Sequence, residues 1–358
     1  MSEVAIARPS VHARSRNTVE IVNVADNSVA DDDFLDLSLD RPVRWTGLSG
    51  LPSNAIERHV RGIRVSRYRG AWQASRALRP GRVLVSHLPL MSAAAATAMK
   101  LLDRQAPHLA FSFTFTNRPT GARLAYMRRA LASVDQFAVY SQYERGLYAD
   151  LFDFDADLFQ PVIWTQTAPN PDPAITQRDA RPYYCAVGGE GRDIATILEV
   201  AKSLPKALRV VIVARPHSVA GLSIPDNVEV HTNIPAGQTW ALAQGSLGVL
   251  LPLLSENTCC GHITLVSAKQ LGIPVATTRA FATREYVEGR GGIIECEPAD
   301  PLAFATLMER LADEQPTLRQ SAQQDRAAEV AFHDRAKWAR YVSEFLDKAV
   351  PDIRSGNA

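Results

Sequence analysis

The stretch from Tyr184 to Ala201, YCAVGGEGRDIATILEVA, decides the fold of the second half of the chain. An apolar run ends in a glycine-rich segment, and a pattern of helical period follows Asp193. Glycines after a strand let the backbone approach a phosphate, and the amides that open the next helix favour an anion. Arg192 would add a bidentate guanidinium, while Asp193 is a typical N-cap. The stretch predicts a phosphate-binding strand–turn–helix unit; a tight turn without a ligand is the alternative for the glycines alone.

A second unit of the same kind lies from Val249 to Thr278, VLLPLLSENTCCGHITLVSAKQLGIPVATT. An apolar strand ends at Pro252, and after a polar loop Gly261 opens a helix that ends at Gly272, a typical C-cap residue. The loop carries hydroxyl, carboxylate and amide side chains, which suit the hydroxyl groups of a sugar. We therefore expect a second helix N-terminus that is suited to phosphate oxygens.

Short apolar or β-branched runs alternate with helical patterns along the chain, which predicts right-handed crossovers and parallel sheets. The runs expected to be strands are 18–24, 82–86, 109–115, 136–140, 183–187, 208–213, 228–231, 247–251, 274–277 and 293–296. We expect a flexible tail at 1–17, an N-terminal domain at 18–164, a proline-rich linker at 165–182, a C-terminal domain at 183–332, and a helix within 333–358 that packs back on the N-terminal domain. The predicted class is α/β, with two Rossmann-like parallel-sheet domains that face each other across a ligand-binding cleft.

The overall charge argues against a nucleic-acid-binding protein. Lys and Arg number 39 and Asp and Glu 38, a formal net charge of +1, which gives no global field to hold a polyanion. No apolar run approaches the roughly 18–20 residues that span a bilayer, and the arginines near the start precede no apolar signal core. Four cysteines are too few for a disulfide framework. We expect a cytoplasmic protein.

Polar residues follow three of the expected strands of the N-terminal half. In the run VLVSHLP, His87 lies at the C-terminal end of the expected strand. A side chain with a pKa near neutrality could there orient an acceptor hydroxyl or stabilise charge; a structural histidine is the alternative. Asn117 and Arg118 lie in the next such loop, TFTNRPT, and are expected on the acceptor side. Ser141 and Glu144 form an S-x-x-E pattern, which indicates a capping box first and cleft lining second.

Local charge is uneven despite the neutral total. The stretch Arg58 to Arg82 contains eight arginines and no acid, and residues 31–40, DDDFLDLSLD, contain five aspartates. One interpretation is two solvated surface segments. The other is that the arginines contact anionic lipid, or a lipid-linked diphosphate, in a peripheral association with the inner face of the plasma membrane.

The motif V-G-G-x-G-R-D before a helix, followed by P-L and then G-x6-A-x3-G-x-P-V, resembles the donor-binding half of GT-B glycosyltransferases. It is most similar to the retaining nucleotide-sugar enzymes of glycosyltransferase family four and their bacterial exopolysaccharide relatives. TREYVEGRGG (283–292) and EPADPL (297–302) resemble the end of the same half. The resemblance covers residues 183–312, and the N-terminal half only by topology.

The resemblance implies that the donor diphosphate lies against the glycine–arginine loop and the amides at the start of the second helix. The donor residues it assigns are Gly188, Gly189, Gly191, Arg192, Arg215, Asn257, Gly261, His262, Ile263, Thr264 and Ser267. Glu256 is the nearest candidate for the family's glutamate at the sugar, and Arg215 is a substitute for its diphosphate lysine. Ser267 stands where the family has a second glutamate; it could bond a ribose hydroxyl but cannot accept bidentately.

These expectations combine into one function: transfer of a sugar, with retention, from a nucleotide sugar to a polysaccharide or lipid-linked saccharide acceptor, in surface or exopolysaccharide biosynthesis. His87, Arg192 and Glu256 are the expected catalytic residues. Arginine and backbone amides can meet the phosphate charge, so no metal or further cofactor is implied. The alternatives are another enzyme of GT-B shape, such as an epimerase or a pyruvyl transferase, and a non-catalytic nucleotide-sugar-binding partner subunit.

Overall fold

The structure is a computed structural model that describes residues 18–29, 32–59, 65–175 and 181–351. The expected tail at 1–17 lies outside this part. The chain divides into two compact units, one of Met1–Ile163 with Arg335–Ala358 and one of Trp164–Asp334. The expected linker, 165–182, is therefore grouped with the second unit, where the Asp172 amide donates to the Gly237 carbonyl at 2.9 Å.

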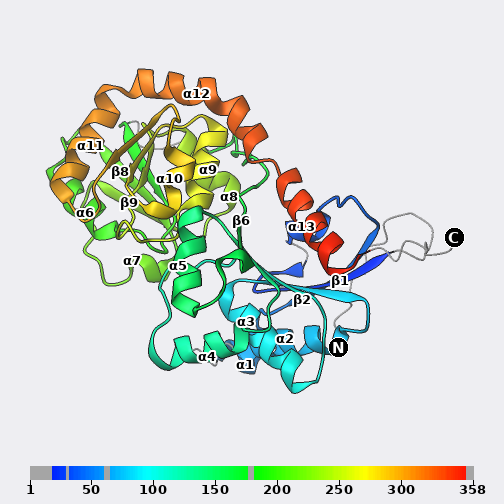
Figure 1. The fold of residues 1–358 in the computed structure, drawn as a ribbon. Helices are drawn as coiled ribbons and strands as arrows, with labels where there is room; N and C mark the ends of the chain where they lie inside the picture. Colours follow the sequence, from blue (N-terminus) through cyan, green and yellow to red (C-terminus); the bar gives the residue numbers. More distant parts are fainter. Residues whose placement is uncertain (1–17, 30–31, 60–64, 176–180, 352–358) are drawn as a thin grey trace. The chain divides into compact units, whose positions relative to one another are not determined.

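The first unit is built on a six-stranded sheet of order β2-β1-β3-β4-β5-β6, in which every described pair is parallel (Figure 1). Its strands are β1 (Val19–Ala25), β2 (Val43–Ser49), β3 (Arg82–His87), β4 (His108–Phe111), β5 (Gln136–Val139) and β6 (Phe159–Pro161). Its helices are α1 (Ala55–His59), α2 (Val65–Ala77), α3 (Pro89–Leu101), α4 (Gly121–Leu131), α5 (Gln142–Phe152) and α13 (Ala336–Ala349), with short 3-10 turns at Asp33–Asp36 and Ala156–Leu158.

Aromatic side chains fill much of the core of this unit. The rings of Phe113, Phe137 and Phe159 lie 4.6–6.0 Å apart under α4 and α5. The C-terminal helix α13 completes the core through Trp338. The centres of the Trp338 and Phe111 rings lie 5.0 Å apart, and the Trp338 indole N–H donates to the Ile163 carbonyl at 3.0 Å. Burial of large aromatic rings explains why a helix so late in the sequence belongs to the first unit.

The second unit contains a six-stranded parallel sheet of order β12-β11-β10-β7-β8-β9. Its strands are β7 (Tyr183–Val187), β8 (Arg209–Ala214), β9 (Val228–Thr232), β10 (Val249–Leu251), β11 (Val275–Thr278) and β12 (Ile293–Cys296). Its helices are α6 (Ile194–Ser203), α7 (Pro216–Val219), α8 (Ala236–Gln244), α9 (His262–Leu271), α10 (Arg284–Val287), α11 (Pro301–Asp313) and α12 (Gln315–Phe332), with a 3-10 turn at Phe281–Thr283.

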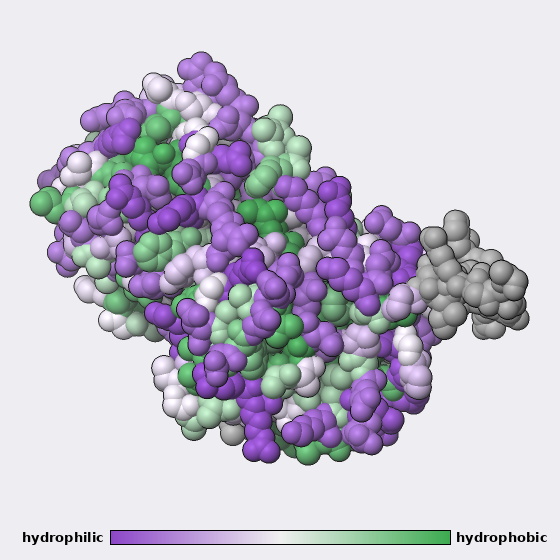
Figure 2. All heavy atoms as spheres, viewed as in Figure 1, coloured by the Kyte–Doolittle hydropathy of each residue, from purple (hydrophilic) through white to green (hydrophobic). Residues whose placement is uncertain are grey.

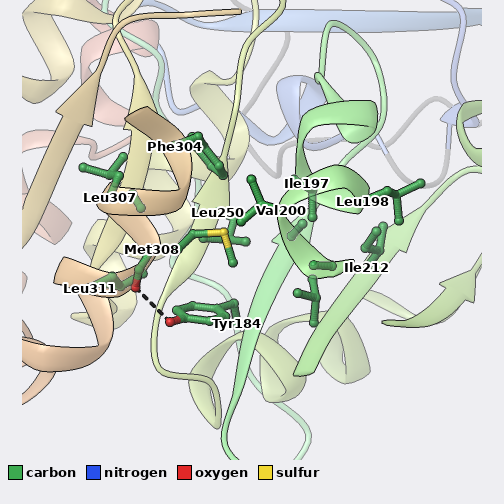
Figure 3. Close-up of a cluster of buried hydrophobic side chains, with 14 of the residues drawn as sticks. Tyr184, Ile197, Leu198, Val200, Ile212, Leu250, Phe304, Leu307, Met308 and Leu311 are labelled. Atoms are coloured by element: carbon green, nitrogen blue, oxygen red, sulfur yellow. Dashed lines mark hydrogen bonds between the residues drawn. The ribbon is translucent and has the colours of Figure 1, made fainter. Parts of the chain in front are cut away.

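The core of the second unit lies between its sheet and helices α6 and α11, as Figure 3 shows. Ile197 from α6 and Phe304 and Met308 from α11 are all buried there. The Tyr184 hydroxyl, buried in the same cluster, donates to the Met308 carbonyl at 2.8 Å, so its polar atom is satisfied. This packing fixes β7, and with it the start of the glycine-rich loop.

The strand order confirms two Rossmann-like α/β domains. In the second sheet the chain runs outward from β7 to β9 and then returns to build β10 to β12 on the other side, so the order reverses between β7 and β10. In the first sheet the reversal lies between β1 and β3. Open parallel sheets bind ligands outside the carboxyl ends of the strands at such a point. The cleft between the two domains stays a prediction.

On the face drawn in Figure 2, most described side chains are hydrophilic, with hydrophobic ones among them. No helix in the described part of the chain is both long enough and apolar enough to cross a membrane.

Candidate functional site

The loops after β7 and β10 meet at the reversal point of the second sheet. Arg192 and Leu253 form an antiparallel bridge, and the Asp193 amide donates to the Pro252 carbonyl at 2.9 Å. The Leu254 amide donates to the Gly191 carbonyl at 3.2 Å. The two sequence motifs, which lie some sixty residues apart, therefore form one structure at the carboxyl edge of the sheet.

Glycine is required in the first loop for conformation and for space. Gly188 has φ of 96° and Gly191 has φ of 66°, values that side chains other than glycine rarely adopt. A Cβ atom on Gly188 would lie 3.1 Å from Nη2 of Arg192, and one on Gly189 would lie 2.0 Å from Oγ of Ser218. The glycines thus let the loop turn back over the Arg192 guanidinium.

The Arg192 guanidinium is held in place from several sides. Nη1 donates to the Glu190 carbonyl at 3.1 Å and to Sγ of Cys260 at 3.3 Å, and Nη2 donates to Oγ1 of Thr264 at 3.1 Å. The Nε atom is buried without a partner, and desolvation lowers the pKa of the group, although part of the residue stays accessible. No described carboxylate forms an ion pair with it. A fixed cation without an ion-pair partner among the described residues suits a diphosphate.

The N-terminus of α9 lies beside this cation. Gly261, at φ of 102°, is the N-cap, and no side chain caps the helix. The first intrahelical bond of this turn is from the Leu265 amide to the Gly261 carbonyl, so the amides of His262, Ile263 and Thr264 precede it without an intrahelical acceptor. These amides and the positive end of the helix dipole favour an anion.

The His262 side chain lies in the interior, away from a diphosphate role. Its ring is buried, and Nε2 bonds the Ala282 carbonyl at 3.0 Å. Desolvation lowers its pKa to about 4, so the ring is neutral at pH 7. The predicted donor role of His262 is therefore open only to its backbone amide. The sequence alone could not show whether the side chain or the backbone amide of His262 faces the ligand. The direction of the ring depends on a distant residue, Tyr286, whose ring centre lies 4.8 Å away.

The other donor-side candidates lie on loops at the same edge. Glu256 and Arg215 are both exposed, and Asn257 is half-buried. The Glu256 carbonyl accepts from the Phe281 amide at 2.8 Å, which fixes the backbone of its loop. The segments after β7 and β8 are in contact, because Oε1 of Glu190 lies 2.7 Å from Nε2 of His217. The roles of Glu256, Asn257 and Arg215 stay predictions.

Ser267 lies deeper in the second unit than a ribose contact requires. The residue is 1% exposed, and its hydroxyl accepts from Nε2 of Gln166 at 2.6 Å. Gln166 also donates to Oε1 of Gln270 at 3.3 Å and belongs to the segment expected to be the linker. A glutamine side chain therefore occupies the hydrogen-bonding position of Ser267, and its contact with a nucleotide stays a prediction.

In the first unit, His87 lies at the carboxyl end of β3, at the reversal point of that sheet. Its Nε2 is 2.8 Å from Oδ1 of Asn23, whose amide donates to Oδ2 of Asp32 at 2.8 Å. Because an amide oxygen only accepts, the neutral ring carries its proton on Nε2 and leaves Nδ1 as an acceptor. Desolvation lowers the pKa of His87 to about 4, and the Asp32 charge opposes that shift. The ring is thus oriented and neutral at pH 7.

Two strained residues accompany His87 at this edge. Leu88 and Ser112, which follow β3 and β4, have φ of 70° and 53°. Such conformations are costly for side chains other than glycine and persist where surrounding contacts hold them. The Leu88 amide donates to the Phe111 carbonyl at 3.1 Å, which joins the segment after β3 to the end of β4. Asn117 and Arg118 are exposed beyond β4, and their acceptor-side role stays a prediction.

Glu144, in the first turn of α5, has a buried carboxyl group. Its Oε2 accepts from the Tyr140 amide at 3.0 Å and the Ser141 hydroxyl at 3.1 Å, and its Oε1 accepts from the Tyr148 hydroxyl at 3.1 Å. The Glu144 amide donates to Oγ of Ser141 at 3.2 Å, so Ser141 caps α5 as predicted, while the return bond of the Glu144 side chain goes to the amide of Tyr140, one residue before the N-cap, so the capping box is only half formed. Desolvation, only partly offset by these bonds, raises the pKa of Glu144 to about 7.

We expect Glu144→Gln to change how stability depends on pH. Between pH 4.5 and about 7 the folded state keeps the Glu144 proton and the unfolded state loses it, so stability falls as pH rises through this window. A shift of this size corresponds to about 3 kcal/mol. Urea denaturation at pH 5, 6, 7 and 8 measures this. The free energy of unfolding of the variant, relative to that of the unmodified protein, should increase as pH rises. A difference that is the same at every pH, or a like change in the exposed control Glu199→Gln, would contradict this.

Three aspartates at the end of α5 and just after it, Asp153, Asp155 and Asp157, have a spacing that metal ligands use, but they do not form a metal site. The Asp157 amide donates to Oδ1 of Asp155 at 2.9 Å, and Asp157 pairs with Nη2 of Arg145 at 2.6 Å. Asp153 ends α5 in the left-handed conformation. Within residues 18–29, 32–59, 65–175 and 181–351, no three His, Cys, Asp or Glu side chains form a group that could hold a metal ion.

No protein-family model matches the chain, and no curated protein matches it in sequence. Solved structures match it in three dimensions. A UDP-forming α,α-trehalose-phosphate synthase from Burkholderia xenovorans is 12% identical with a TM-score of 0.68, and the match covers 92% of this chain and 99% of that one. A sucrose-phosphate synthase from Thermosynechococcus elongatus is 12% identical with a TM-score of 0.68, over 93% and 99% of the two chains.

Anabaena HepE in complex with UDP-glucose is 11% identical with a TM-score of 0.67, over 92% of this chain and 99% of that one. All three neighbours are GT-B glycosyltransferases, which agrees with the resemblance found in the sequence. Identities this low establish the fold and leave activity to be argued from the site. The chain has the fold of the GT-B glycosyltransferases.

Proposed function

We propose that the protein is a glycosyltransferase that moves a hexose from a nucleoside-diphosphate sugar to a saccharide or lipid-linked acceptor. The observation that carries this proposal is the Arg192 guanidinium, fixed between the Gly188 turn and the N-terminus of α9. A departing nucleoside diphosphate gains negative charge, and a preorganised cation with helix amides stabilises it without reorganisation. The match to HepE, whose structure contains UDP-glucose, supports the same ligand class.

The first unit would bind the acceptor. His87 is neutral and held by Asn23, so Nδ1 can accept a hydrogen bond from an acceptor hydroxyl and orient it. Glu256, on an exposed loop of the second unit, would hold the donor sugar. Retention of the anomeric configuration and a role in surface polysaccharide biosynthesis are part of the proposal and follow from the sequence resemblance.

A nucleotide-sugar-binding protein without transferase activity is the second candidate. Ser267, which stands where the resemblance places a second glutamate, is buried under Gln166 and has no carboxylate to offer a ribose. Such a protein would keep the diphosphate clamp and lose turnover.

A thermal-shift screen followed by an activity assay separates the two candidates. We expect UDP or another nucleoside diphosphate, and its sugar conjugates, to stabilise the protein, since a ligand at 100 times its Kd adds about 2.7 kcal/mol. Release of the nucleoside diphosphate should then follow when a donor and a lipid-linked or saccharide acceptor are supplied. Binding without release would favour the second candidate, and the absence of binding by any nucleoside diphosphate would refute both.

We also propose a peripheral contact with the membrane, through fewer residues than the whole stretch Arg58 to Arg82. Arg67, Arg69 and Arg82 form ion pairs with Asp26, Glu57 and Glu20, so these arginines are not available to lipid, while Arg61 and Arg64 lie outside the described residues. Exposed arginines and apolar side chains of α1 and α2 supply the surface instead: Ile56, Arg58, Val65, Trp72 and Arg76. Exposed apolar residues beside cations are typical of interfacial helices.

We expect Ile56→Ser with Trp72→Ser to reduce binding to anionic vesicles at least tenfold, because each apolar side chain gains about 1.5–3 kcal/mol on burial. Flotation with phosphatidylserine-containing and phosphatidylcholine-only vesicles measures this, and binding should weaken with salt. Leu302→Ser is the matched control, since Leu302 is an apolar residue of the second unit that is 79% exposed. If the unmodified protein does not float with anionic vesicles, the membrane proposal is wrong.

A further inference from the structure

A pocket of about 660 Å³ lies at the end of the first sheet that is opposite to His87. Its walls are the last turns of α3 and α4 and the segments that lead from them into β4 and β5. Because every described strand pair of this sheet is parallel, these segments lie at the amino edge and His87 lies at the carboxyl edge. The pocket is therefore separate from the candidate functional site.

Small side chains leave this space open. Ala96 on α3, Ala130 on α4 and the loop residues Ala106 and Ala132 line the pocket, with Met99 beside them. Helices α3 and α4 are neighbours in the fold (Figure 1), and larger residues at these positions would close the gap between them. The volume is within the range of about 300–1,000 Å³ that small-molecule sites occupy.

Three cations line the pocket: Lys100, Arg104 and Arg129. All three are exposed, and none forms an ion pair with a described residue. Lys100 and Arg129 lie in the last turns of α3 and α4, where positive charge offsets the helix dipole. Arg104 lies beyond both helices, so the dipole does not account for the whole set. Three unpaired cations around one cavity favour an anionic ligand.

The pocket also contains groups that recognise hydroxyls. Asp103, held at φ of 50°, is exposed, and Asp135 keeps one carboxylate oxygen after the other accepts from the His108 amide at 2.7 Å. Tyr126 is 37% exposed, and its hydroxyl is 3.2 Å from Oγ1 of Thr97. Carboxylates would repel a ligand that is anionic throughout, but they accept hydrogen bonds from a polyol, and the tyrosine offers a flat apolar surface.

We propose that this pocket binds a sugar that carries one anionic group, a phosphate or a carboxylate. The cations of Lys100, Arg104 and Arg129 bind the anion, and Asp103 and Asp135 accept from ring hydroxyls. Tyr126 contacts the apolar face of the ring. The ligand is either a free sugar phosphate or an acidic residue of a saccharide chain, and in both cases it binds away from the candidate site.

Isothermal titration of the full chain tests this with four probes: glucose 6-phosphate, glucuronate, glucose and inorganic phosphate. We expect saturable binding of one or both of the anionic sugars, and binding at least tenfold weaker for glucose and for phosphate alone. Saturating UDP should leave the affinity unchanged, because the two sites lie on different units. Tighter binding of glucose 6-phosphate identifies a sugar phosphate as the ligand, and tighter binding of glucuronate identifies an acidic saccharide.

Two surface variants locate the binding. Arg129→Ala and Lys100→Ala should each weaken it at least tenfold, while Arg123→Ala, an exposed arginine of α4 outside the pocket lining, should leave it unchanged. All three positions are exposed, so folding is retained and a melting curve verifies it. Binding that survives both pocket variants, or no binding of either anionic sugar at millimolar concentration, overturns the proposal. A failure of transferase activity would not affect these outcomes, since the readout is binding to the first unit.

Discussion

Arg192→Ala is expected to weaken nucleoside-diphosphate binding by a factor of roughly 10 to 150. A hydrogen bond to a charged group contributes about 1.5–3 kcal/mol, and the guanidinium can donate more than one such bond to a diphosphate. Titration with UDP and with UDP-glucose measures the loss. In a transferase assay the fall in kcat/KM should be at least as large, because the diphosphate gains charge as the sugar leaves.

Two further variants separate a binding role of Arg192 from a structural one. Arg192→Lys keeps the charge but cannot match the bonds to Glu190, Cys260 and Thr264, so it should recover only part of the affinity. Lys202→Ala, an exposed cation in the last turn of α6, serves as the control. An unchanged affinity for UDP in folded Arg192→Ala would remove Arg192 from the diphosphate site, and with it the main support for the proposed function.

The glycine–arginine motif could be interpreted from sequence because its signals are local. The strand, the positive φ of Gly188, the Asp193 cap and the helix all lie within one short stretch, and the structure has each of them. The cap is direct, since Oδ1 of Asp193 accepts from the Thr196 amide at 3.0 Å. Local chemistry of this kind depends little on the rest of the chain.

Helices and strands whose burial depends on residues far away in the sequence could not be predicted from the sequence. The sequence pattern predicts no strand at β2, whose side chains are mostly half-buried and show no clean alternation. The pattern also predicts no helix at α12, in which only Leu318, Ala322 and Glu329 are buried, so the apolar stripe is too narrow to detect. The inward ring of His262 and the glutamine over Ser267 depend on contacts 20 and 101 residues away. Such contacts leave no local periodicity to detect.

Glu329 on α12 is the clearest of these distant dependences. Its carboxylate is 1% exposed and lies 2.7 Å from Nζ of Lys269 on α9 and 3.2 Å from Nη1 of Arg290. Its oxygens have no aligned hydrogen-bond donor, so the contacts are mainly charge–charge. Burial raises the pKa of Glu329, but the contact with His333 at 3.3 Å and the charges of Lys269 and Arg290 outweigh it, and the pKa is lowered overall.

We expect Glu329→Ala to lower the free energy of unfolding of the second unit by about 3–5 kcal/mol, because it leaves the buried Lys269 ammonium without its counter-charge. Lys269→Met together with Glu329→Leu should cost much less than the sum of the single changes, since an apolar pair of similar volume avoids the desolvation of both ions. Urea denaturation at pH 7 measures four variants: Glu329→Ala, the double variant, and its two single changes, Lys269→Met and Glu329→Leu. Additive losses in the double variant would show that volume, not charge, sets the cost.

The same cluster predicts a dependence on pH with a defined sign. A carboxylate whose folded pKa is lowered adds stability above its unfolded pKa of 4.5, and loses that contribution as pH falls through the folded value. The free-energy difference between the unmodified protein and Glu329→Ala should therefore shrink as pH falls below 4.5. The stabilising contribution of Glu144 has the opposite dependence, since it is lost as pH rises from 4.5 to about 7. Glu144 and Glu329 belong to different units. The changes in the free energy of unfolding caused by Glu144→Gln and Glu329→Ala should therefore add when both are present. A departure from additivity would mean that the two units do not unfold independently.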